Sequence, residues 1–332
     1  MEKILDIIII TYNSGDVTLP CLDSVIKSDS SDAFNIVVVD NNSQDATPHI
    51  LKNAQKRMPN RITSRFEKTN LGFARACNIG AGLFNSKFIL FLNPDTLIED
   101  KTALIQMVNF MRADEKVAVA GPRILNDSRG IEHTCRRFPS LSRVFLDECR
   151  TYKLFPSKKS FRGTRITDWD HNDTREVAQV IGACFMTRRT IFYELGGFDE
   201  RFFMYYEEVD YCYRAKKKGY KVYFFSPAAI IHKGGYSSMQ ESETGTLDIY
   251  RYRYESLVAF YKKHFKSYVF FLYVILIPSL LVKFFIEYFL YAVTRNRDYA
   301  IISFSHLKAW KYVFFSFFHT KNPEITHSRK KP

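Results

Sequence analysis

The sequence lacks the cysteine pairs that mark small metal domains and redox sites. Its six cysteines stand at positions 21, 77, 135, 149, 184 and 212, and no two of them form a C-x-x-C pair. This spacing excludes a zinc knuckle and a thioredoxin-like motif. Scattered cysteines in a chain of 332 residues favour a reducing compartment.

The first residues also lack the features of a secretory signal peptide. An acidic residue, Glu2, comes at once, the apolar run Ile7–Ile10 is short, and no small-residue cleavage site follows it. We therefore expect no cleaved leader.

Acidic residues are scarce in the C-terminal tail. Residues 261–332 contain 12 Lys and Arg but only 3 Asp and Glu. The first 260 residues contain 36 Lys and Arg and 32 Asp and Glu. The near balance of the larger part argues against a nucleic-acid binder, although the net charge is +13. A basic tail that is also rich in Phe, Tyr, Ile and Leu favours an anionic membrane surface as its partner.

The tail contains a long apolar stretch at residues 267–293, which only Lys283 and Glu287 interrupt. Its uncharged part, Ser267–Val282, is short for a membrane span, which needs about 20 residues. It also contains Pro278. A kinked or re-entrant membrane helix fits as well as a full span, and a helical subdomain packed on the core is the alternative.

Strand and helix signals alternate through the first half of the chain. Short β-branched apolar runs predict buried strands, and apolar residues at helical spacing predict helices. The predicted strands are Leu5–Thr11, Asn35–Asp40, Arg61–Glu67, Phe88–Leu92 and Val117–Ala120, and the predicted helices are Val17–Lys27, Thr47–Met58, Gly72–Leu83 and Thr102–Arg112. This alternation predicts an α/β fold with a mostly parallel central sheet flanked by helices.

The second half is less regular. Residues 126–176 are rich in Arg, Ser and Thr with weak periodicity, and we predict a long insertion or mobile loop there. The later predicted elements are strands at Val177–Thr187 and Lys221–Phe225, helices at Arg189–Leu195 and Glu207–Lys218, and an aromatic segment at Trp310–Phe318 suited to a lipid headgroup region.

Polar clusters follow three predicted strands directly: Thr11-Tyr12-Asn13, Asp40-Asn41-Asn42 and Asn93-Pro94-Asp95. Ligands of α/β sheets bind at the carboxyl ends of the strands, so we expect these clusters to converge. Asp40 can bind a nucleobase or ribose, or cap a turn. Asp95 suits a hard cation on a diphosphate, or a solvated turn.

Three carboxylates, Glu207, Glu208 and Asp210, fall within four residues at the start of a predicted helix. A helix N-terminus accommodates acids, and Asp210 with Arg214 is an ordinary i,i+4 pair. The aromatic residues between Phe202 and Tyr206 can exclude water and raise a carboxylate pKa, as a general base requires.

His232 follows the last predicted strand and precedes Gly234-Gly235. It can ligate a metal, contact phosphate or be structural. A glycine pair lets the backbone approach a ligand closely.

Together these clusters resemble glycosyltransferase family 2, and within it the rhamnosyltransferase-like members. The resemblance covers roughly residues 4–264. It rests on Thr11-Tyr12-Asn13, Val39-Asp40-Asn41-Asn42-Ser43, Asn70-Leu71-Gly72-Phe73-Ala74 with Asn78, Phe91-Leu92-Asn93-Pro94-Asp95, Gly196-Gly197-Phe198-Asp199-Glu200 through Asp210, and His232-Lys233-Gly234-Gly235.

The resemblance implies a GT-A catalytic domain over residues 1–264. Its nucleotide-sugar-binding half would span residues 1–125 and its acceptor-binding half residues 126–264. Residues 265–332 would form basic, apolar, membrane-associated helices.

The resemblance also implies a role for each matching residue. Asp95 and His232 would hold Mg²⁺ or Mn²⁺, with Asn93 standing where many members have Asp. Glu208 takes the position of the catalytic base, usually Asp, with Glu207 as the alternative. The donor would contact Thr11, Tyr12, Asn13, Asp40, Asn42, Asn70, Gly72, Phe73, Asn78 and Asn93, and the acceptor would contact Gly182, Ala183 and Asp210.

The implied activity is inverting transfer of a sugar, L-rhamnose from dTDP-L-rhamnose, to a polyprenyl-diphosphate-linked or glycan acceptor. The implied setting is bacterial surface polysaccharide synthesis at the cytoplasmic face of the inner membrane. A UDP-sugar donor and an inactive sugar-binding scaffold are the alternatives. A nucleotidyltransferase would need a basic, Gly-rich loop after the first strand, which Thr11–Asp16 lacks.

Overall fold

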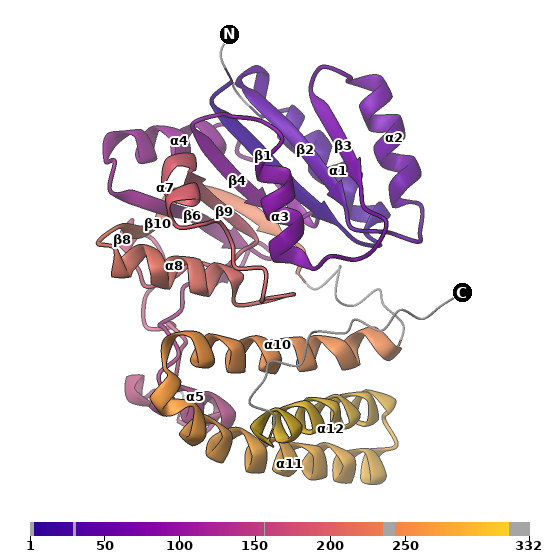
Figure 1. Cartoon of the computed structure of the whole chain (residues 1–332), viewed down its shortest axis with the longest axis vertical. Helices are drawn as coiled ribbons and strands as arrows, with labels where there is room; N and C mark the ends of the chain where they lie inside the picture. Colours follow the sequence, from indigo (N-terminus) through magenta and orange to yellow (C-terminus); the bar gives the residue numbers. More distant parts are fainter. Residues whose placement is uncertain (1–2, 29–30, 156, 235–242, 319–332) are drawn as a thin grey trace.

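A mixed sheet forms the centre of the molecule (Figure 1). The computed structural model describes residues 3–28, 31–155, 157–234 and 243–318. Within them the strands follow the order β3-β2-β1-β4-β9-β6-β10-β5, with β7 beside β6 and β8 beside β10. Their bounds are β1 Leu5–Thr11, β2 Phe34–Asp40, β3 Ile62–Phe66, β4 Phe88–Leu92, β5 Thr96–Leu97, β6 Val117–Leu125, β7 Ile131–Glu132, β8 Arg175–Glu176, β9 Cys184–Arg188 and β10 Lys221–His232.

The central strands of the sheet are mostly parallel, as the sequence predicts. β1 pairs in parallel with β2 and β4, β2 with β3, and β6 with β10. β9 enters antiparallel between β4 and β6. The sequence places this strand's start at Val177, but residues before Cys184 leave the sheet because their carbonyls bond elsewhere: Gln179 accepts from the Arg136 amide and Ala183 from the Asn93 amide.

Alternate side chains of the sheet enter two separate cores. Leu5, Ile7 and Ile9 of β1 face one core, and Ile8 and Ile10 face the other. This follows from the two-residue period of a strand. Helices α1 (Gly15–Ile26), α2 (Thr47–Arg57) and α4 (Ala103–Ala113) cover the first face, and α3 (Phe73–Ala81), α7 (Arg189–Glu194) and α8 (Glu207–Lys217) cover the second.

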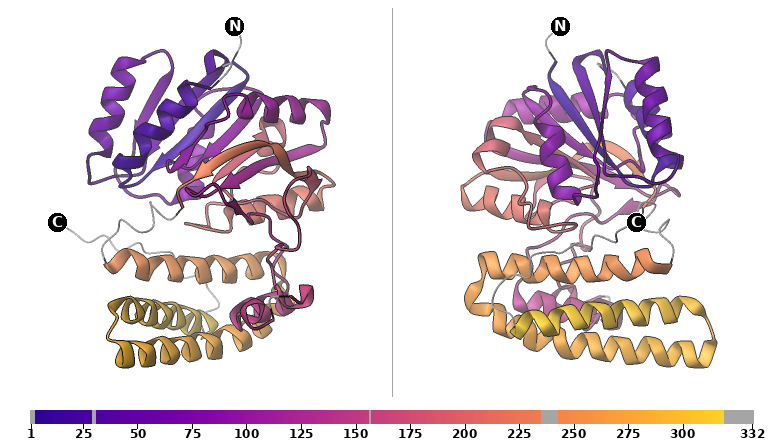
Figure 2. Two further views of the ribbon diagram at one scale, coloured as in Figure 1. Left: turned by 180° about the vertical axis from the view of Figure 1, so that it is seen from behind. Right: turned by 45° about the vertical axis from the view of Figure 1, so that its right-hand side comes forward.

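A separate helical layer lies below the sheet (Figures 1 and 2). It consists of α10 (Glu243–His264), α11 (Val269–Thr294) and α12 (Arg297–Phe318), which run roughly parallel to one another. Their buried side chains form a third core, which also receives Phe202 and Val209 from the sheet domain. The helical layer therefore begins with α10, before the boundary that the sequence places at residue 265.

The stretch 126–176 is more structured than the predicted insertion or mobile loop. It contains α5 (Leu141–Glu148) and α6 (Thr151–Leu154), and Val144 of α5 joins the core of the helical layer. Tyr254 of α10 donates its hydroxyl to Glu148 at 3.1 Å. Contacts with α10 and α11, about a hundred residues away in the chain, hold these short helices in place. Their local sequence therefore needs no periodic pattern, and none was visible.

The residues that interrupt the apolar run of α11 face the protein. Lys283 contacts Glu148 at 2.7 Å, and Glu287 lies 3.6 Å from Arg150. Phe285 and Phe289 on the same helix are 62% and 66% exposed. An 18-residue window within Lys266–Thr294 has a mean hydropathy of 2.5, and the helix is, by length and composition alone, able to cross a membrane.

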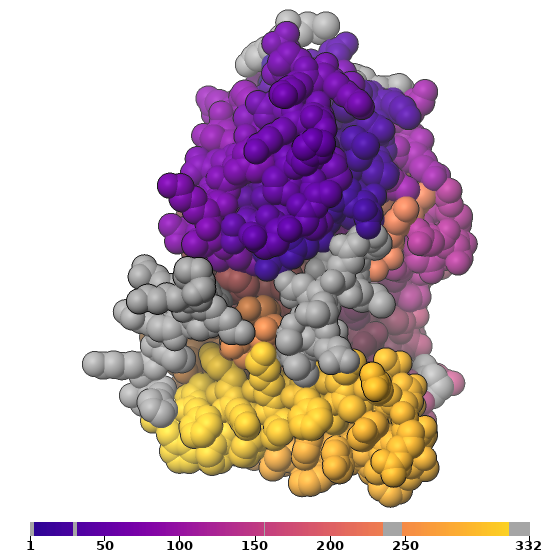
Figure 3. Space-filling view, turned by 90° about the vertical axis from the view of Figure 1, so that its right-hand side faces the viewer, coloured from indigo at the N-terminus to yellow at the C-terminus, as the bar shows by residue number. Residues whose placement is uncertain are grey.

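Large apolar side chains also gather on the outer surface of the helical layer. Figure 3 shows α11 and α12 covering the end of the molecule opposite the N-terminal strands. The exposed apolar residues of this layer are Tyr268, Phe270, Phe271, Val274, Val282, Phe285, Ile286, Tyr288, Phe289, Val293, Phe304, Phe315, Phe317 and Phe318. We call these residues the apolar face.

Candidate active site

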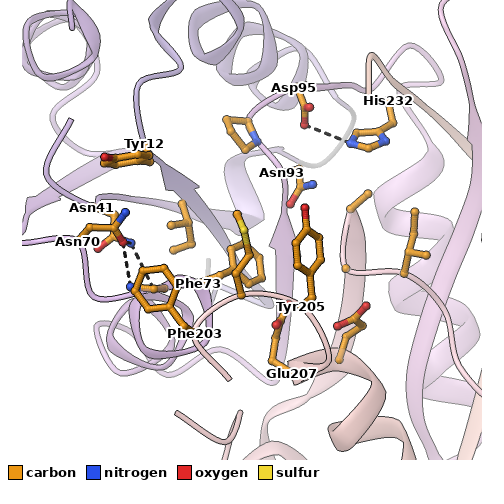
Figure 4. Close-up of a pocket in the computed structure, with 18 residues that line it drawn as sticks. Tyr12, Asn41, Asn70, Phe73, Asn93, Asp95, Phe203, Tyr205, Glu207 and His232 are labelled. Carbon is orange, nitrogen blue, oxygen red and sulfur yellow. Dashed lines mark hydrogen bonds and ion pairs between the residues drawn. The ribbon is translucent and has the colours of Figure 1, made fainter. Parts of the chain in front are cut away.

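A cavity of about 410 Å³ lies at the carboxyl ends of β1 and β4 (Figure 4), where the strand-end rule places it. Eleven predicted site residues line this donor cavity: Tyr12, Asn70, Gly72, Phe73, Asn93, Asp95, Gly182, Ala183, Glu207, Glu208 and His232. Seven further lining residues were not among the predicted site residues: Ile10, Asn41, Pro94, Ile181, Phe203, Met204 and Tyr205.

Asn41 fixes one end of the donor cavity. Its side chain donates to the Asn70 side-chain oxygen at 2.9 Å and accepts from the Leu71 amide at 2.8 Å. The carboxamide therefore joins the end of β2 to the start of α3. The signal for it was its place in the strand-end cluster, directly beside Asp40.

Several predicted donor residues lie behind the cavity wall. The Asp40 carboxylate is 2% exposed and accepts from the Thr11 hydroxyl at 3.0 Å and the Ser43 hydroxyl at 2.5 Å. Asn13 accepts from the Gln44 amide at 2.7 Å. Asn42 does not line the cavity either. In this structure Thr11, Asn13 and Asp40 hold the ends of β1 and β2 together.

Asn78 is likewise occupied by the protein. Its amide donates to the Phe198 carbonyl at 2.8 Å, and its oxygen accepts from the Phe198 amide at 3.0 Å. This pair of bonds fastens α3 to the Gly196–Glu200 turn, so a side chain that was predicted to bind donor positions the turn instead.

Asp210 differs from its predicted role in acceptor binding. It is fully buried and contacts Arg214 at 2.7 Å, Lys263 at 2.6 Å and His264 at 2.6 Å. Burial alone would raise its pKa, but these contacts lower it on balance. Oδ1 contacts Lys263 and His264 and so joins α8 to α10, whereas Oδ2 contacts Arg214 within α8, so the protein occupies both oxygens.

Gly72 permits a close approach that shapes the cavity. The Phe73 amide donates to the Phe203 carbonyl at 2.6 Å. A Cβ on Gly72 would stand 2.5 Å from that carbonyl oxygen, and the residue has φ +82°. Only glycine meets both conditions without strain.

The segment 203–206 leads directly into α8. Tyr205 and Tyr206 both have positive φ, 68° and 69°, which is uncommon for residues with large side chains. The Ser256 hydroxyl of α10 donates to the Met204 carbonyl at 2.9 Å, and the Tyr206 ring packs on Phe260. The helical layer thus holds the segment from the side opposite Gly72.

A second cavity of about 570 Å³ lies between the sheet domain and the helical layer. We call it the interlayer cavity. It shares only Ile181, Tyr205 and Glu208 with the donor cavity, so Glu208 faces both spaces. Glu207 lines the donor cavity but not the interlayer cavity, and it is 5% exposed.

Burial perturbs both glutamates. Burial and the charge of Glu208 raise the pKa of Glu207 well above its ordinary 4.5. Burial also raises the pKa of Glu208, while backbone amides at the helix start lower it in part. Both carboxyl groups are therefore more basic than that of an exposed glutamate, as a general base requires.

Asp95 and His232 provide a candidate cation site. Asp95 Oδ1 lies 3.3 Å from His232 Nε2, and His232 Nδ1 lies 3.8 Å from Glu132. Asp95 Oδ1 is buried and makes no hydrogen bond. In the described part of the chain no three His, Cys, Asp or Glu side chains assemble as a metal site. A cation here would need phosphate or water oxygens as well, which suits Mg²⁺ or Mn²⁺ on a diphosphate.

Two solved structures share the fold. Mannosyltransferase PcManGT from Pyrobaculum calidifontis, solved with GDP-Man and Mn²⁺, gives a TM-score of 0.56 at 15% identity over 97% of this chain and 89% of its own. GalNAc-T7, solved with UDP, GalNAc and Mn²⁺, gives 0.58 at 15% identity over 81% and 50%. The fold is GT-A, as predicted.

A family profile described as Glycosyl transferase family 2 matches residues 6–196. The chain belongs to that family. It is similar to the N-acetylglucosaminyl-diphospho-decaprenol L-rhamnosyltransferase of Mycobacterium tuberculosis, with 25% identity over 254 residues, which cover 72% of this chain and 78% of that relative.

Replacement of Gly72 tests the close approach that shapes the cavity. Gly72→Ala places a residue at φ 82°, ψ 169°, a region that costs about 1–3 kcal/mol for a residue with a Cβ. It also forces Phe203 away. We expect a lower free energy of unfolding and weaker nucleoside diphosphate binding, measured by chemical denaturation and titration calorimetry.

Gly219→Ala is the matched control, because Gly219 has φ +84° and no atom within 4 Å of its added Cβ. It should lose stability through backbone strain alone and keep nucleotide binding. Equal effects of the two substitutions on binding would contradict a role for the Gly72–Phe203 contact.

Proposed function

We propose that this glycosyltransferase moves L-rhamnose from dTDP-L-rhamnose to a lipid-linked or glycan acceptor, with inversion at the anomeric carbon, in bacterial surface polysaccharide synthesis. The observation that carries this proposal is the position of Glu208 at the junction of two cavities. A single displacement needs a base that faces the donor on one side and the acceptor hydroxyl on the other.

The donor cavity fits a nucleotide sugar. Tyr12, Asn41 and Asn70 lie at one end and Asp95, Asn93 and His232 at the other (Figure 4). We assign the aromatic and amide end to the nucleoside, and the Asp95 end to the diphosphate. Asp95 and His232 would hold a divalent cation, which when bound neutralises charge on the departing diphosphate.

In the proposed reaction, the Glu208 carboxylate takes the proton of an acceptor hydroxyl. The oxygen of that hydroxyl forms a bond to the anomeric carbon from the face opposite the nucleotide. The bond between the anomeric carbon and the diphosphate oxygen breaks, and the nucleoside diphosphate leaves. The buried surroundings of Glu207 and Glu208 exclude water that would compete for the sugar.

The rhamnose assignment draws on the name of the mycobacterial relative and on the motifs in the sequence. The same name supports a diphospho-polyprenol acceptor.

The apolar face of the helical layer supports attachment to an anionic membrane surface, at the cytoplasmic face of the inner membrane. Soluble proteins rarely expose an apolar patch of this extent. Helix α11 packs along α12, and its charged residues Lys283 and Glu287 pair with Glu148 and Arg150 of the protein. We therefore propose that the hairpin of α11 and α12 lies in the plane of the membrane.

Removing the negative charge of Glu208 tests the base. In Glu208→Gln we expect kcat to fall by about a hundredfold to ten-thousandfold, the usual worth of a general base, with donor binding retained. Glu207→Gln is the comparison variant, because Glu207 lines the donor cavity but not the interlayer cavity, and we expect it to lower kcat less. Near-normal turnover by Glu208→Gln would contradict the assignment.

The pH profile gives a second readout of the same group. The base must be ionised, and burial raises the pKa of Glu208, so kcat/KM should rise with pH along a limb centred above 4.5. A limb at or below the ordinary glutamate value would contradict this. Initial rates across a pH series with saturating acceptor measure it.

A panel of nucleotide sugars tests the function itself. We expect selective, divalent-cation-dependent binding and hydrolysis of dTDP-L-rhamnose, both lost in chelator and in Asp95→Ala. Selective use of a UDP-sugar would replace the donor and keep the mechanism. Binding of every donor without turnover in the presence of acceptor would indicate an inactive sugar-binding scaffold.

Substitution of the apolar face tests membrane attachment. Phe285→Ser with Phe289→Ser should reduce co-sedimentation with anionic phospholipid vesicles by more than about tenfold, since each buried Phe contributes about 1.5–3 kcal/mol. Phe66→Ser with Phe84→Ser, at exposed positions of the sheet domain, is the matched control. Unchanged sedimentation of the first variant would contradict the proposed surface.

A further inference from the structure

The interlayer cavity carries an excess of positive charge. Six basic side chains line it, against the three carboxylates of Asp147, Glu148 and Glu208. Two of the six are paired with acids: Lys283 with Glu148 at 2.7 Å and Arg150 with Glu287 at 3.6 Å. Among the residues that the structure describes, the other four have no carboxylate partner: Arg136, Lys153, Arg165 and Arg253.

The three arginines of this unpaired group share one space. Arg253 of α10 borders the cavity with an exposed side chain; burial lowers its pKa, but the charges of neighbouring groups, among them Glu148 and Asp147, raise it on balance. Burial and the charges of Arg165 and Arg253 lower the pKa of Arg136 to about 10. The guanidinium of Arg165 stacks 4.3 Å from the Tyr152 ring centre and gains no negative charge there. Clustered cations repel one another, and a bound anion lowers that repulsion.

Carboxylates of the cavity offset this charge only in part: Asp147 favours the charged forms of Arg136 and Arg253. Glu148 accepts from Tyr254, Ser279 and Lys283. Asp147 accepts from the amide and hydroxyl of Thr164, at 3.1 and 2.6 Å. Glu208 belongs to the junction with the donor cavity. The lining therefore keeps an excess of positive charge that can receive an anion from outside the described chain.

The walls indicate what kind of anion enters. The side nearest the reaction is Tyr205 and Glu208, and the opposite walls are α10, α11 and α12, through Tyr250, Lys283 and His306. The outer surface of α11 and α12 is the apolar face. An anion in this cavity would thus have the catalytic junction on one side and lipid-compatible helices on the other.

We propose that the interlayer cavity binds the diphosphate of a lipid-linked sugar acceptor, with Arg136, Arg165 and Arg253 as its ligands. This inference rests on the proposed function, and it assigns the acceptor's recognition to its charge rather than to its sugar. The diphosphate joins the three arginines through bidentate, charge-assisted hydrogen bonds. The sugar then extends toward Glu208, and the polyprenyl chain extends toward the apolar face.

Binding can be measured without turnover. The probes are farnesyl diphosphate, farnesyl monophosphate and farnesol, titrated against the full chain in neutral detergent. We expect the affinity to fall from the diphosphate to the monophosphate and from the monophosphate to the alcohol. Arg136→Gln and Arg253→Gln should each weaken diphosphate binding by roughly tenfold to a hundredfold, the size expected for one lost charge-assisted hydrogen bond.

Two control variants locate the probe. Arg251→Gln lies on α10 beside Arg253 but pairs with Asp248 and Glu255 outside the cavity, and it should bind the probe normally. Asp95→Ala should also bind it normally. If Asp95→Ala loses the probe while the arginine variants keep it, the diphosphate occupies the donor cavity and the proposal is overturned.

The source of the phosphate is distinguished by competition. Short-chain phosphatidylglycerol should displace farnesyl diphosphate poorly, and equal displacement would make the cavity a phospholipid headgroup site, which overturns the proposal. Nucleoside diphosphate binding and donor hydrolysis, measured on the three arginine variants, should be unchanged. If the wild-type chain neither binds nor hydrolyses any nucleotide sugar, that result counts against the proposed function. The farnesyl diphosphate titrations would still decide what the interlayer cavity binds.

Discussion

The geometry of the site depends on the segment 203–206 being held from both sides. Gly72 admits the Phe203 carbonyl to the start of α3, and Ser256 of α10 binds the Met204 carbonyl. Tyr205 and Tyr206, both in the left-handed backbone conformation, then lead the chain into α8, and each conformation costs on the order of 1–3 kcal/mol. The contacts on both sides offset that cost. The glutamates that follow are therefore fixed relative to the sheet and the helical layer together.

Much of the first half of the fold could be predicted because its signals are local. Leu5–Thr11 and Phe88–Leu92 are buried apolar runs, and they form β1 and β4 with the same bounds. β10 was predicted only to Phe225, because Ser226 and Pro227 are typical of a strand end. The strand continues to His232 across a register shift between Phe225 and Ala229. A bulge of that kind depends on the neighbouring strand and leaves no periodic signal.

The site was predictable where it follows strand ends and unpredictable where it depends on distant packing. Tyr12, Asn93 and Asp95 line the donor cavity because parallel strands end together. Asp40 ends its strand in the same way, but Thr11 and Ser43 occupy its carboxylate, which only the three-dimensional arrangement reveals. The wall of the interlayer cavity from Arg136 to Arg165 could not be predicted, since its short helices are held by α10 and α11.

Because the two cavities share few lining residues, their walls can change independently of each other. Only Ile181, Tyr205 and Glu208 border both spaces. The remaining walls of the interlayer cavity come from segments of the chain that contribute nothing to the donor cavity, chiefly 136–165 and 249–254. If the interlayer cavity holds the acceptor as proposed, exchange of those segments by recombination or engineering would redirect the enzyme to a new acceptor and leave its donor unchanged.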